Sequence, residues 1–311
     1  MPKSSKQRNV VRTILTWYKR QGRTLPWRLP TGQAGGISNP YRILISEIML
    51  QQTQVSRVLV KYPEFLRNFP TLRSLANAKQ RDVVLAWQGM GYNNRAVRLH
   101  GFAQTVFKNY RGKIPQTFES LIALPGIGKY TANAMLSSAF GKDLPIVDVN
   151  VQRVFSRIFW KMDSTAAMKS SKEIWRLAEV ILPKRKAYDW NQAVMDLGAT
   201  VCTARNPKCD ACPVAQLCAS RKRMNRESPV RPKREPSLDG IPNRFYRGRI
   251  IERLRTRTGS VRLDVLGKAI YPKFAKQHEA WLRSVLSDLE RDKLICVHGN
   301  GSLRSSRVVL V

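Results

Sequence analysis

Four of the five cysteines in this 311-residue chain lie within seventeen residues, in the pattern C-x6-C-x2-C-x5-C. They are Cys202, Cys209, Cys212 and Cys218. Zinc sites usually combine two cysteine pairs, or a cysteine pair and a histidine pair, separated by roughly a dozen residues or more. This loop has a single C-x2-C pair, and four thiolates on one compact loop suit a [4Fe-4S] cluster. The spacing therefore favours an iron–sulfur cluster over zinc, and either metal over redox disulfides.

The charge of the chain indicates a polyanionic partner. Lys and Arg number 55 against 21 Asp and Glu, which gives a formal net charge of +34. Phosphate backbones are the commonest polyanion, so nucleic acid is favoured over a merely solvated basic surface or a ribosome-associated protein. The N-terminal residues have no apolar run long enough for a signal peptide, and we expect no later stretch to span a membrane. We expect an intracellular protein in a reducing, cytoplasmic compartment, associated with the nucleoid and not with membranes.

The segment "LIALPGIGKYTANAMLSSAFGK" predicts a helix–hairpin–helix. An apolar helix ends at Pro125, Gly126 and Gly128 permit a tight turn, and a second helix follows immediately. Exposed backbone N–H groups and a helix N-terminus together bind phosphate well. The alternative is an ordinary turn between two helices.

Apolar spacing divides the chain into two domains joined by a linker. Residues 1–220 show helical periodicity and no convincing strand pattern, which predicts a mostly α domain. Residues 221–244 carry four prolines and many charges, which is typical of a linker. Residues 245–311 predict three helices followed by a hairpin about Asn300-Gly301, the order of a winged-helix-like α/β domain. A module that only completes the core is the alternative for this last segment.

Asp148, in "PIVDVNVQRVFSRIF", precedes a helix with an apolar face and is an N-cap candidate. A carboxylate so soon after a phosphate-binding hairpin opposes DNA binding unless it serves chemistry. Asp148 is therefore a candidate catalytic residue as well.

These motifs together resemble the endonuclease III superfamily of base-excision DNA glycosylases. The hairpin, the "VDVN" segment and the cysteine loop carry that resemblance, over roughly residues 10–220. Within the superfamily, "LPWR", "SEIMLQQTQV" and "WNQAVMDLGATVC" are similar to the MutY family of adenine DNA glycosylases. The resemblance implies a helix-hairpin-helix glycosylase fold, a [4Fe-4S] cluster on residues 202–218, and double-stranded DNA with a mismatch or lesion as the partner of a monomer.

The resemblance also implies two catalytic carboxyl groups. Breaking an N-glycosidic bond creates an oxocarbenium-like sugar, so an ionised carboxylate near the sugar and an acid at the leaving base both help. Asp148 matches the ionised group. Glu47 matches the acid that protonates adenine N7, and burial is expected to raise its pKa.

Other family positions are expected to bind the extruded base and the duplex. Trp27 and Arg28 line the base pocket, and Gln192 reads the edge of adenine. The remaining expected DNA contacts are Gln51, Gln52, Gln54, Tyr92, Gly126, Gly128 and Lys129. Ordinary structural readings also exist: Trp27 as plain core, and the three glutamines as a polar helix face.

One position indicates the reaction type. Superfamily members that also cut the strand carry a lysine two residues after the second hairpin glycine, because a Schiff base requires an amine. Tyr130 occupies that position here. We expect a monofunctional glycosylase that leaves an abasic site, with Tyr130 against the deoxyribose and little or no lyase activity from the neighbouring Lys129.

Two features depart from the MutY pattern. Asn93 stands where an aromatic residue is usual, and residues 245–311 are too short for the Nudix-like domain that recognises 8-oxoguanine in that family. Adenine opposite guanine or 8-oxoguanine is the favoured substrate. The alternatives are a glycosylase for mismatched thymine or uracil or another modified base, and a non-catalytic DNA-binding module.

Overall fold

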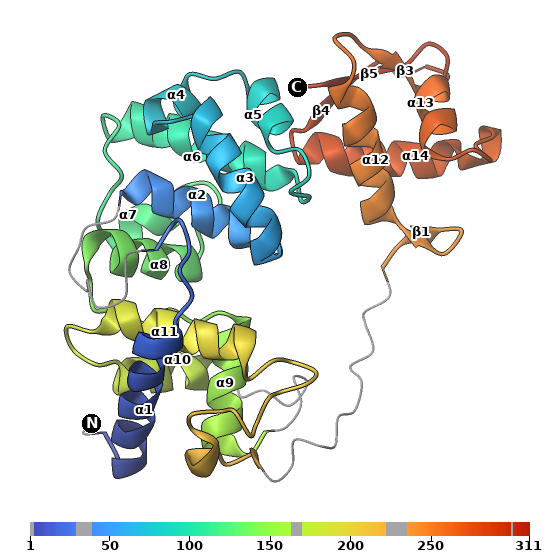
Figure 1. The fold of residues 1–311 in the computed structure, drawn as a ribbon. Helices are drawn as coiled ribbons and strands as arrows, with labels where there is room; N and C mark the ends of the chain where they lie inside the picture. The colour runs from blue at the N-terminus through green and yellow to red at the C-terminus, as the bar shows by residue number, and fades with distance from the viewer. Residues whose placement is uncertain (1–2, 29–38, 163–169, 222–234, 300) are drawn as a thin grey trace. The chain divides into compact units, whose positions relative to one another are not determined.

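The computed structural model describes residues 3–28, 39–162, 170–221, 235–299 and 301–311. The chain forms two compact units, and helices dominate both (Figure 1). The first unit contains residues 1–47, 114–123 and 127–232, and the second contains residues 48–113, 124–126 and 233–311. No helix in the described segments is long and apolar enough to span a bilayer.

The first unit is helical, as the sequence predicts. Its elements are α1 (Ser5–Gln21), α7 (Phe118–Ile122), α8 (Lys129–Phe140), α9 (Val149–Trp160), α10 (Ser171–Ile181), α11 (Ala187–Thr200) and the short η2 (Ala215–Leu217). The helix α2 (Pro40–Leu50) runs across the boundary between the units, with Glu47 on the side of the first.

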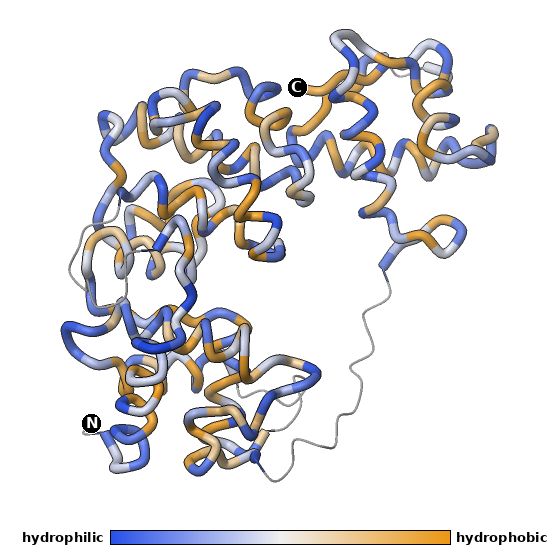
Figure 2. The backbone as a smooth tube through the Cα atoms, in the orientation of Figure 1, coloured by the Kyte–Doolittle hydropathy of each residue, from blue (hydrophilic) through white to orange (hydrophobic). Residues whose placement is uncertain are grey.

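The core of the first unit is formed by the apolar faces of α1, α9, α10 and α11. Hydrophobic and hydrophilic residues alternate along these helices with the period that buries one face (Figure 2). Phe155 of α9 stacks on Trp190 of α11, with ring centroids 6.3 Å apart. Three of the clustered cysteines, Cys202, Cys212 and Cys218, pack against the same core. The cysteine loop is therefore built onto the helices that carry the polar site described below.

The predicted helix–hairpin–helix is present as α7, a turn and α8. Gly126 adopts φ +78° in the turn, a left-handed conformation that glycine reaches without strain. Gly128 is different, because it has an ordinary extended φ of −103° and is the N-cap of α8. A side chain at Gly128 would meet no protein atom within 4 Å. The space beside the N-cap of α8 is thus open, and no side chain among the described residues caps this helix.

The second unit begins with four helices, α3 (Val55–Asn68), α4 (Leu72–Ala76), α5 (Gln80–Ala86) and α6 (Asn94–Asn109). Arg95 of α6 is their central polar group, with only 6% of its surface exposed. Its guanidinium donates to the carbonyls of Ile48, Met49, Gln51, Met90 and Gly91 and to the Thr53 hydroxyl. Burial lowers the pKa of Arg95 to about 10, which leaves it protonated at neutral pH. One arginine thereby joins the loop after α2 to the loop before α6.

The C-terminal module of the second unit, residues 235–311, has the predicted three helices and terminal hairpin. Its helices are α12 (Asn243–Arg255), α13 (Leu263–Ile270), the short η4 (Lys276–His278) and α14 (Glu279–Arg291). Its antiparallel sheet has the order β3-β5-β4, formed by Val261–Arg262, Arg307–Leu310 and Ile295–His298. In β4 and β5, Val297 pairs with Val308. The predicted turn residue Asn300 lies outside the described residues.

Two details of the module differ from the sequence expectation. Residues at the end of the expected linker form a small hairpin, β1 (Ser237–Leu238) and β2 (Ile241–Pro242), and α12 starts two residues before Phe245. The hairpin turn places Asp239 and Gly240 at positive φ, a local signal that the proline content obscured. The strand β3 was also not expected, because two residues carry no periodic pattern.

We predict that Arg95→Met lowers the free energy of unfolding by about 3–5 kcal/mol, since it leaves several buried carbonyls without a donor. Chemical denaturation of the variant beside the wild type measures this loss. Lys108→Met, at an exposed position of the same helix, is the matched control and should change stability by less than about 0.5 kcal/mol. Equal stability of both variants would show that Arg95 does not hold the two loops.

Candidate active site

A buried acid lies beside a half-buried tyrosine in the first unit. Glu47 of α2 is 9% exposed, and burial raises its pKa to about 7. The neighbouring Tyr130 hydroxyl and Arg28 guanidinium act in the opposite direction, whereas the Asp148 carboxylate raises the pKa of Glu47 further. Glu47 Oε2 is buried and has no hydrogen-bond partner among the described residues. The side chain is therefore a proton donor near neutral pH with one oxygen uncommitted.

Tyr130 occupies the second residue of α8, directly after the hairpin. Burial, followed by the charges of Glu47 and Asp148, raises the pKa of Tyr130 well above its ordinary value, so the hydroxyl stays neutral. Its oxygen lies 3.9 Å from the Met195 sulfur on α11. The three side chains expected to do chemistry, Glu47, Asp148 and Tyr130, thus lie within electrostatic reach of one another.

Arg28 is paired with a carboxylate that the sequence analysis did not identify. Asp196 of α11 is fully buried and accepts two hydrogen bonds from Arg28, at 2.9 and 3.0 Å. Arg23 donates to the same carboxylate from its backbone and its guanidinium. Burial alone would raise the pKa of Asp196, but the hydrogen bonds from both arginines lower it below its ordinary value. The ion pair with Asp196 fixes Arg28 and neutralises much of its positive charge. The effect of Arg28 on Glu47 is reduced accordingly.

Asp148 is the N-cap of α9, as the sequence predicts. Its Oδ1 accepts the backbone N–H of Val151 at 2.7 Å, and its Oδ2 accepts the Asn150 amide at 2.7 Å. Hydrogen bonds thus occupy both oxygens of Asp148 at the N-terminus of α9. Asp148 therefore has the environment opposite to that of Glu47.

A chain of hydrogen bonds connects Asp148 to the cysteine loop. Asn150 Oδ1 accepts from Arg153 Nη2 at 2.8 Å, and Arg153 Nε donates to the carbonyl of Cys202 at 2.9 Å. Arg153 also donates to the Gly198 carbonyl at 2.7 Å. A Cβ atom at Gly198 would lie 2.7 Å from the Asn150 side chain, so glycine is required for this approach of α11 to α9. The position of Asp148 thus depends on the loop through two side chains.

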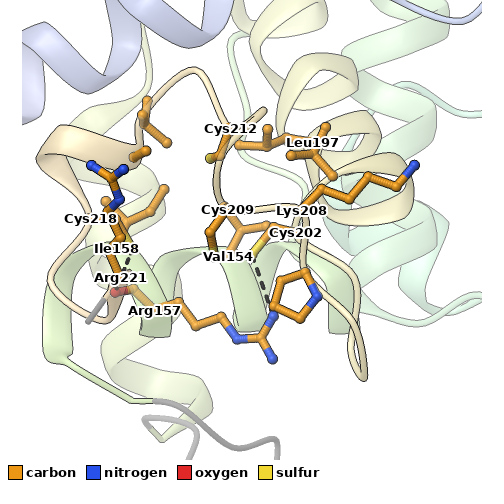
Figure 3. Close-up of a pocket in the computed structure, with 14 residues that line it drawn as sticks. Val154, Arg157, Ile158, Leu197, Cys202, Lys208, Cys209, Cys212, Cys218 and Arg221 are labelled. Carbon is orange, nitrogen blue, oxygen red and sulfur yellow. Dashed lines mark hydrogen bonds between the residues drawn. The ribbon is translucent and has the colours of Figure 1, made fainter. Parts of the chain in front are cut away.

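The four cysteine thiols line one cavity together with apolar residues of α9 and α11 (Figure 3). Arg157 crosses the base of this cavity and donates to Cys202 Sγ at 3.5 Å and to the Thr203 carbonyl at 2.6 Å. The Cys218 thiol lies 3.4 Å from the Arg157 carbonyl. No three ligand side chains of the described chain converge on one ion position. The donor set is nevertheless uniform, because no histidine or carboxylate lines the cavity.

Four thiols on an apolar wall fit an iron–sulfur cluster, whose ligands are cysteine thiolates. Burial raises the pKa of Cys209 and Cys218, and raises that of Cys212 to about 11. The thiols would thus be protonated without a metal, and metal binding is what releases their protons. Arg157, which the sequence analysis missed, supplies positive charge beside the bound thiolates.

Two of the residues expected to form the base pocket are buried. Trp27 is 7% exposed and Gln192 is 5% exposed. Gln192 precedes Met195 and Asp196 by one helical turn, so the three side chains share one face of α11. Among the described residues, no hydrogen bond occupies the Gln192 amide, whereas the neighbouring Asn191 amide bonds with Ile146, Ser137 and Leu144. Of the pair, only Gln192 has an amide available to a ligand.

The expected DNA-contacting residues of the second unit lie on the two loops that Arg95 joins. Gln52 and Gln54 are exposed and Gln51 is half-buried, and Tyr92 is 52% exposed. Gln52 and Tyr92 adopt φ of +53° and +44°, which side chains rarely tolerate and which often marks functional positions. Lys129, at the hairpin, places its ammonium over the Trp175 ring at 4.0 Å from the centroid. It therefore points toward α10.

Two family descriptions match the chain. Residues 45–180 match the HhH-GPD superfamily base excision DNA repair protein, and residues 202–218 match the iron-sulfur binding domain of endonuclease III. The second match covers the cysteine loop from its first thiol to its last, and the chain binds a [4Fe-4S] cluster there.

Curated relatives extend the match into the C-terminal module. The chain is 39% identical to the adenine DNA glycosylase of Mycobacterium tuberculosis over 277 residues, which is 88% of each protein. It is also 39% identical to the adenine DNA glycosylase of Homo sapiens over 233 residues, which is 74% of this chain and 42% of the human protein.

Solved structures show the same fold. A thermostable thymine-DNA glycosylase superposes with a TM-score of 0.62 at 32% identity, over 70% of this chain and 97% of that one. An endonuclease III–DNA complex superposes with a TM-score of 0.60 at 23% identity, over 72% of this chain and all of the other. With the buried acid, the capped aspartate and the cysteine loop in place, the chain is a DNA glycosylase that belongs to the HhH-GPD superfamily of base excision DNA repair proteins and, within it, to the family of the adenine DNA glycosylases.

Proposed function

We propose that this glycosylase hydrolyses the N-glycosidic bond of adenine mispaired with guanine or 8-oxoguanine, and releases free adenine from an abasic site. The observation that carries the proposal is the contrast between two neighbouring carboxyl groups. Glu47 is buried with its pKa raised to about 7, while Asp148 is hydrogen-bonded at both oxygens. Two carboxyl groups in opposite environments can serve as acid and as charge stabiliser in the same step.

Glu47 is the acid for the leaving base. Its uncommitted Oε2 donates a proton to adenine N7, so the base departs neutral and does not accumulate negative charge. The Tyr130 hydroxyl and the Arg28 guanidinium lower the pKa of Glu47, but burial outweighs both, and Arg28 is paired with Asp196. The base must first leave the duplex, and the buried Trp27 contributes an apolar wall for it.

Asp148 stabilises the sugar cation that forms as the bond breaks. Its negative charge faces the developing oxocarbenium ion, and water then adds to the anomeric carbon and loses a proton. Asn150 and Val151 hold the carboxylate in place without neutralising it. A cluster bound by the four cysteines would hold the loop to which Arg153 and Arg157 are hydrogen-bonded.

Gln192 supports adenine as the base. An amide can donate one hydrogen bond to the edge of adenine and accept another from it. A purely hydrophobic pocket offers neither hydrogen bond. The Gln192 amide has this capacity uncommitted, on the helix face that carries Met195 beside Tyr130. The names of the curated relatives agree with this choice.

The same geometry supports a reaction with water and no strand cleavage. Tyr130 offers no amine, and the Lys129 ammonium lies over Trp175. A Schiff base therefore has no nucleophile at the hairpin. The hairpin glycines 126 and 128, with Lys129, would bind the DNA backbone, and Gln51, Gln52, Gln54 and Tyr92 would contact the duplex at the mispair. We propose a monomeric enzyme on nucleoid DNA.

A second candidate function is removal of thymine or uracil from mismatches with guanine. The observation that favours it is the 32% identity and TM-score of 0.62 to a thymine-DNA glycosylase. The acid and the capped aspartate serve either base, so the choice depends on the pocket and on Gln192.

We predict single-turnover release of adenine from duplexes with A:G and A:8-oxoG, and at least tenfold slower release from T:G, U:G and hypoxanthine pairs. The substrates are short end-labelled duplexes, quenched with and without alkali. Strand breaks should appear only after alkali, since the product is an intact abasic strand. Faster release of thymine or uracil would establish the second candidate, and breaks without alkali would contradict the hydrolytic reaction.

We predict that Asp148→Asn slows base release on the order of a hundredfold or more, because the sugar cation loses its counter-charge. Asparagine is also a good N-cap, so the fold should remain intact. Binding to the same duplex should be equal or tighter, since one negative charge near DNA is removed. The exposed Asp82→Asn is the control, with wild-type rates expected. Base release by Asp148→Asn at the wild-type rate would exclude this role.

A further inference from the structure

Asn93, which departs from the family pattern, has a partner in the C-terminal module. Its side-chain oxygen accepts a hydrogen bond from Arg255 Nη2 at 3.0 Å. The same guanidinium nitrogen donates to the backbone carbonyl of Val84 at 2.9 Å. Both groups belong to the second unit, so this contact joins α12 to the helices α5 and α6 within one compact body.

The contact is buried rather than superficial. The side chain of Arg255 is 3% exposed and is paired with Glu252 of its own helix. Glu252 in turn accepts from the Gln88 amide at 2.8 Å. Arg255 Nε is buried without a partner among the described residues. A buried donor without a partner is unfavourable, and an arginine exposed to solvent would avoid this penalty. The guanidinium is therefore committed to Asn93 and Val84.

Asn93 directly follows Tyr92 in a loop that is already strained. Tyr92 adopts φ +44°, and its ring lies 5.7 Å from the Arg95 guanidinium. Arg95 holds the Met90 and Gly91 carbonyls on one side of the tyrosine, and Arg255 holds Asn93 on the other. A strained backbone persists only where surrounding contacts hold it in place. The Tyr92 loop has such contacts at both ends.

The loop and the module also line one groove of about 780 Å³. One wall contains Gln52, Gln54, Arg57 and Tyr92, and the other contains Arg244, Phe245 and Arg247. Tyr92 and Phe245 are 52% and 51% exposed, and the Arg244 guanidinium lies 4.8 Å from the Phe245 ring centroid. Exposed aromatic rings interleaved with arginines suit unstacked bases and their phosphates.

We propose that Arg255 is a positioning residue which, through Asn93, holds the Tyr92 loop in its DNA-binding conformation, so that loop and module form two walls for one DNA strand. The proposal rests on the proposed function only in taking the mispaired duplex as the ligand. It gives the C-terminal module a part in DNA binding by way of a loop outside that module.

The test is a double-mutant cycle on binding. The probe is a duplex that carries a tetrahydrofuran abasic analogue, so that binding is read by fluorescence anisotropy whether or not any base is released. Asn93→Ala should bind about tenfold more weakly, the loss expected for one hydrogen bond to a charged group. Tyr92→Ala should bind at least as weakly, and the double variant no more weakly than Tyr92→Ala alone.

Asn109→Ala, at the exposed far end of α6, is the matched control and should bind as the wild type does. A merely structural role of Asn93 would lower the melting temperature and weaken binding equally with or without Tyr92. Additive losses, or binding by Asn93→Ala within twofold of the wild type, would overturn the proposal. Failure to release adenine would contradict the proposed function alone, because this binding measurement does not require it.

Discussion

The proposed catalytic site depends on a proton kept on one carboxyl group, Glu47, and on a second carboxyl group, Asp148, fixed close by. Burial keeps the proton on Glu47, because desolvation disfavours its ionised form more than Tyr130 and Arg28 favour it. Hydrogen bonds from the Asn150 amide and the Val151 N–H fix Asp148 at the N-terminus of α9. If Arg28 were free to pair with Glu47, the acid would ionise. Asp196, with both oxygens engaged by arginines, prevents that.

The second requirement is a fixed position for Asp148. The cysteine loop contributes to it through hydrogen bonds with α9, and we assign the loop no chemistry at the sugar. Arg153 links Asn150 to the Cys202 carbonyl, and Arg157 holds the loop at Thr203. The close approach of α11 at Gly198 completes this arrangement. Hydrogen bonds from Arg153 and Arg157 thus tie the cysteine loop to α9, the helix that Asp148 caps.

Local signals in the sequence predicted the elements that are defined by neighbouring residues. The hairpin follows from Pro125 and Gly126, and the N-cap follows from Asp148 before an apolar helix face. The cysteine loop was evident from spacing alone. Arg95, Asp196 and Arg255 were not predicted, because each is an ordinary charged residue until a distant segment buries it. Arg95 acquires its role from carbonyls more than forty residues earlier, and Arg255 from Asn93, 162 residues away. The short hairpin β1–β2 was missed because prolines around it resemble a linker.

The central claim is that Glu47 must be protonated when the bond breaks, and the pH dependence of single-turnover adenine release tests it most directly. The raised pKa means that the acid form persists up to about pH 7 and is lost above it. The rate on saturating A:G duplex should therefore be high below that pH and fall about tenfold per pH unit above it. Glu47→Gln should lose both the activity and this descending limb. A flat profile from pH 6 to 9 in the wild type, or appreciable release by Glu47→Gln, would contradict the account.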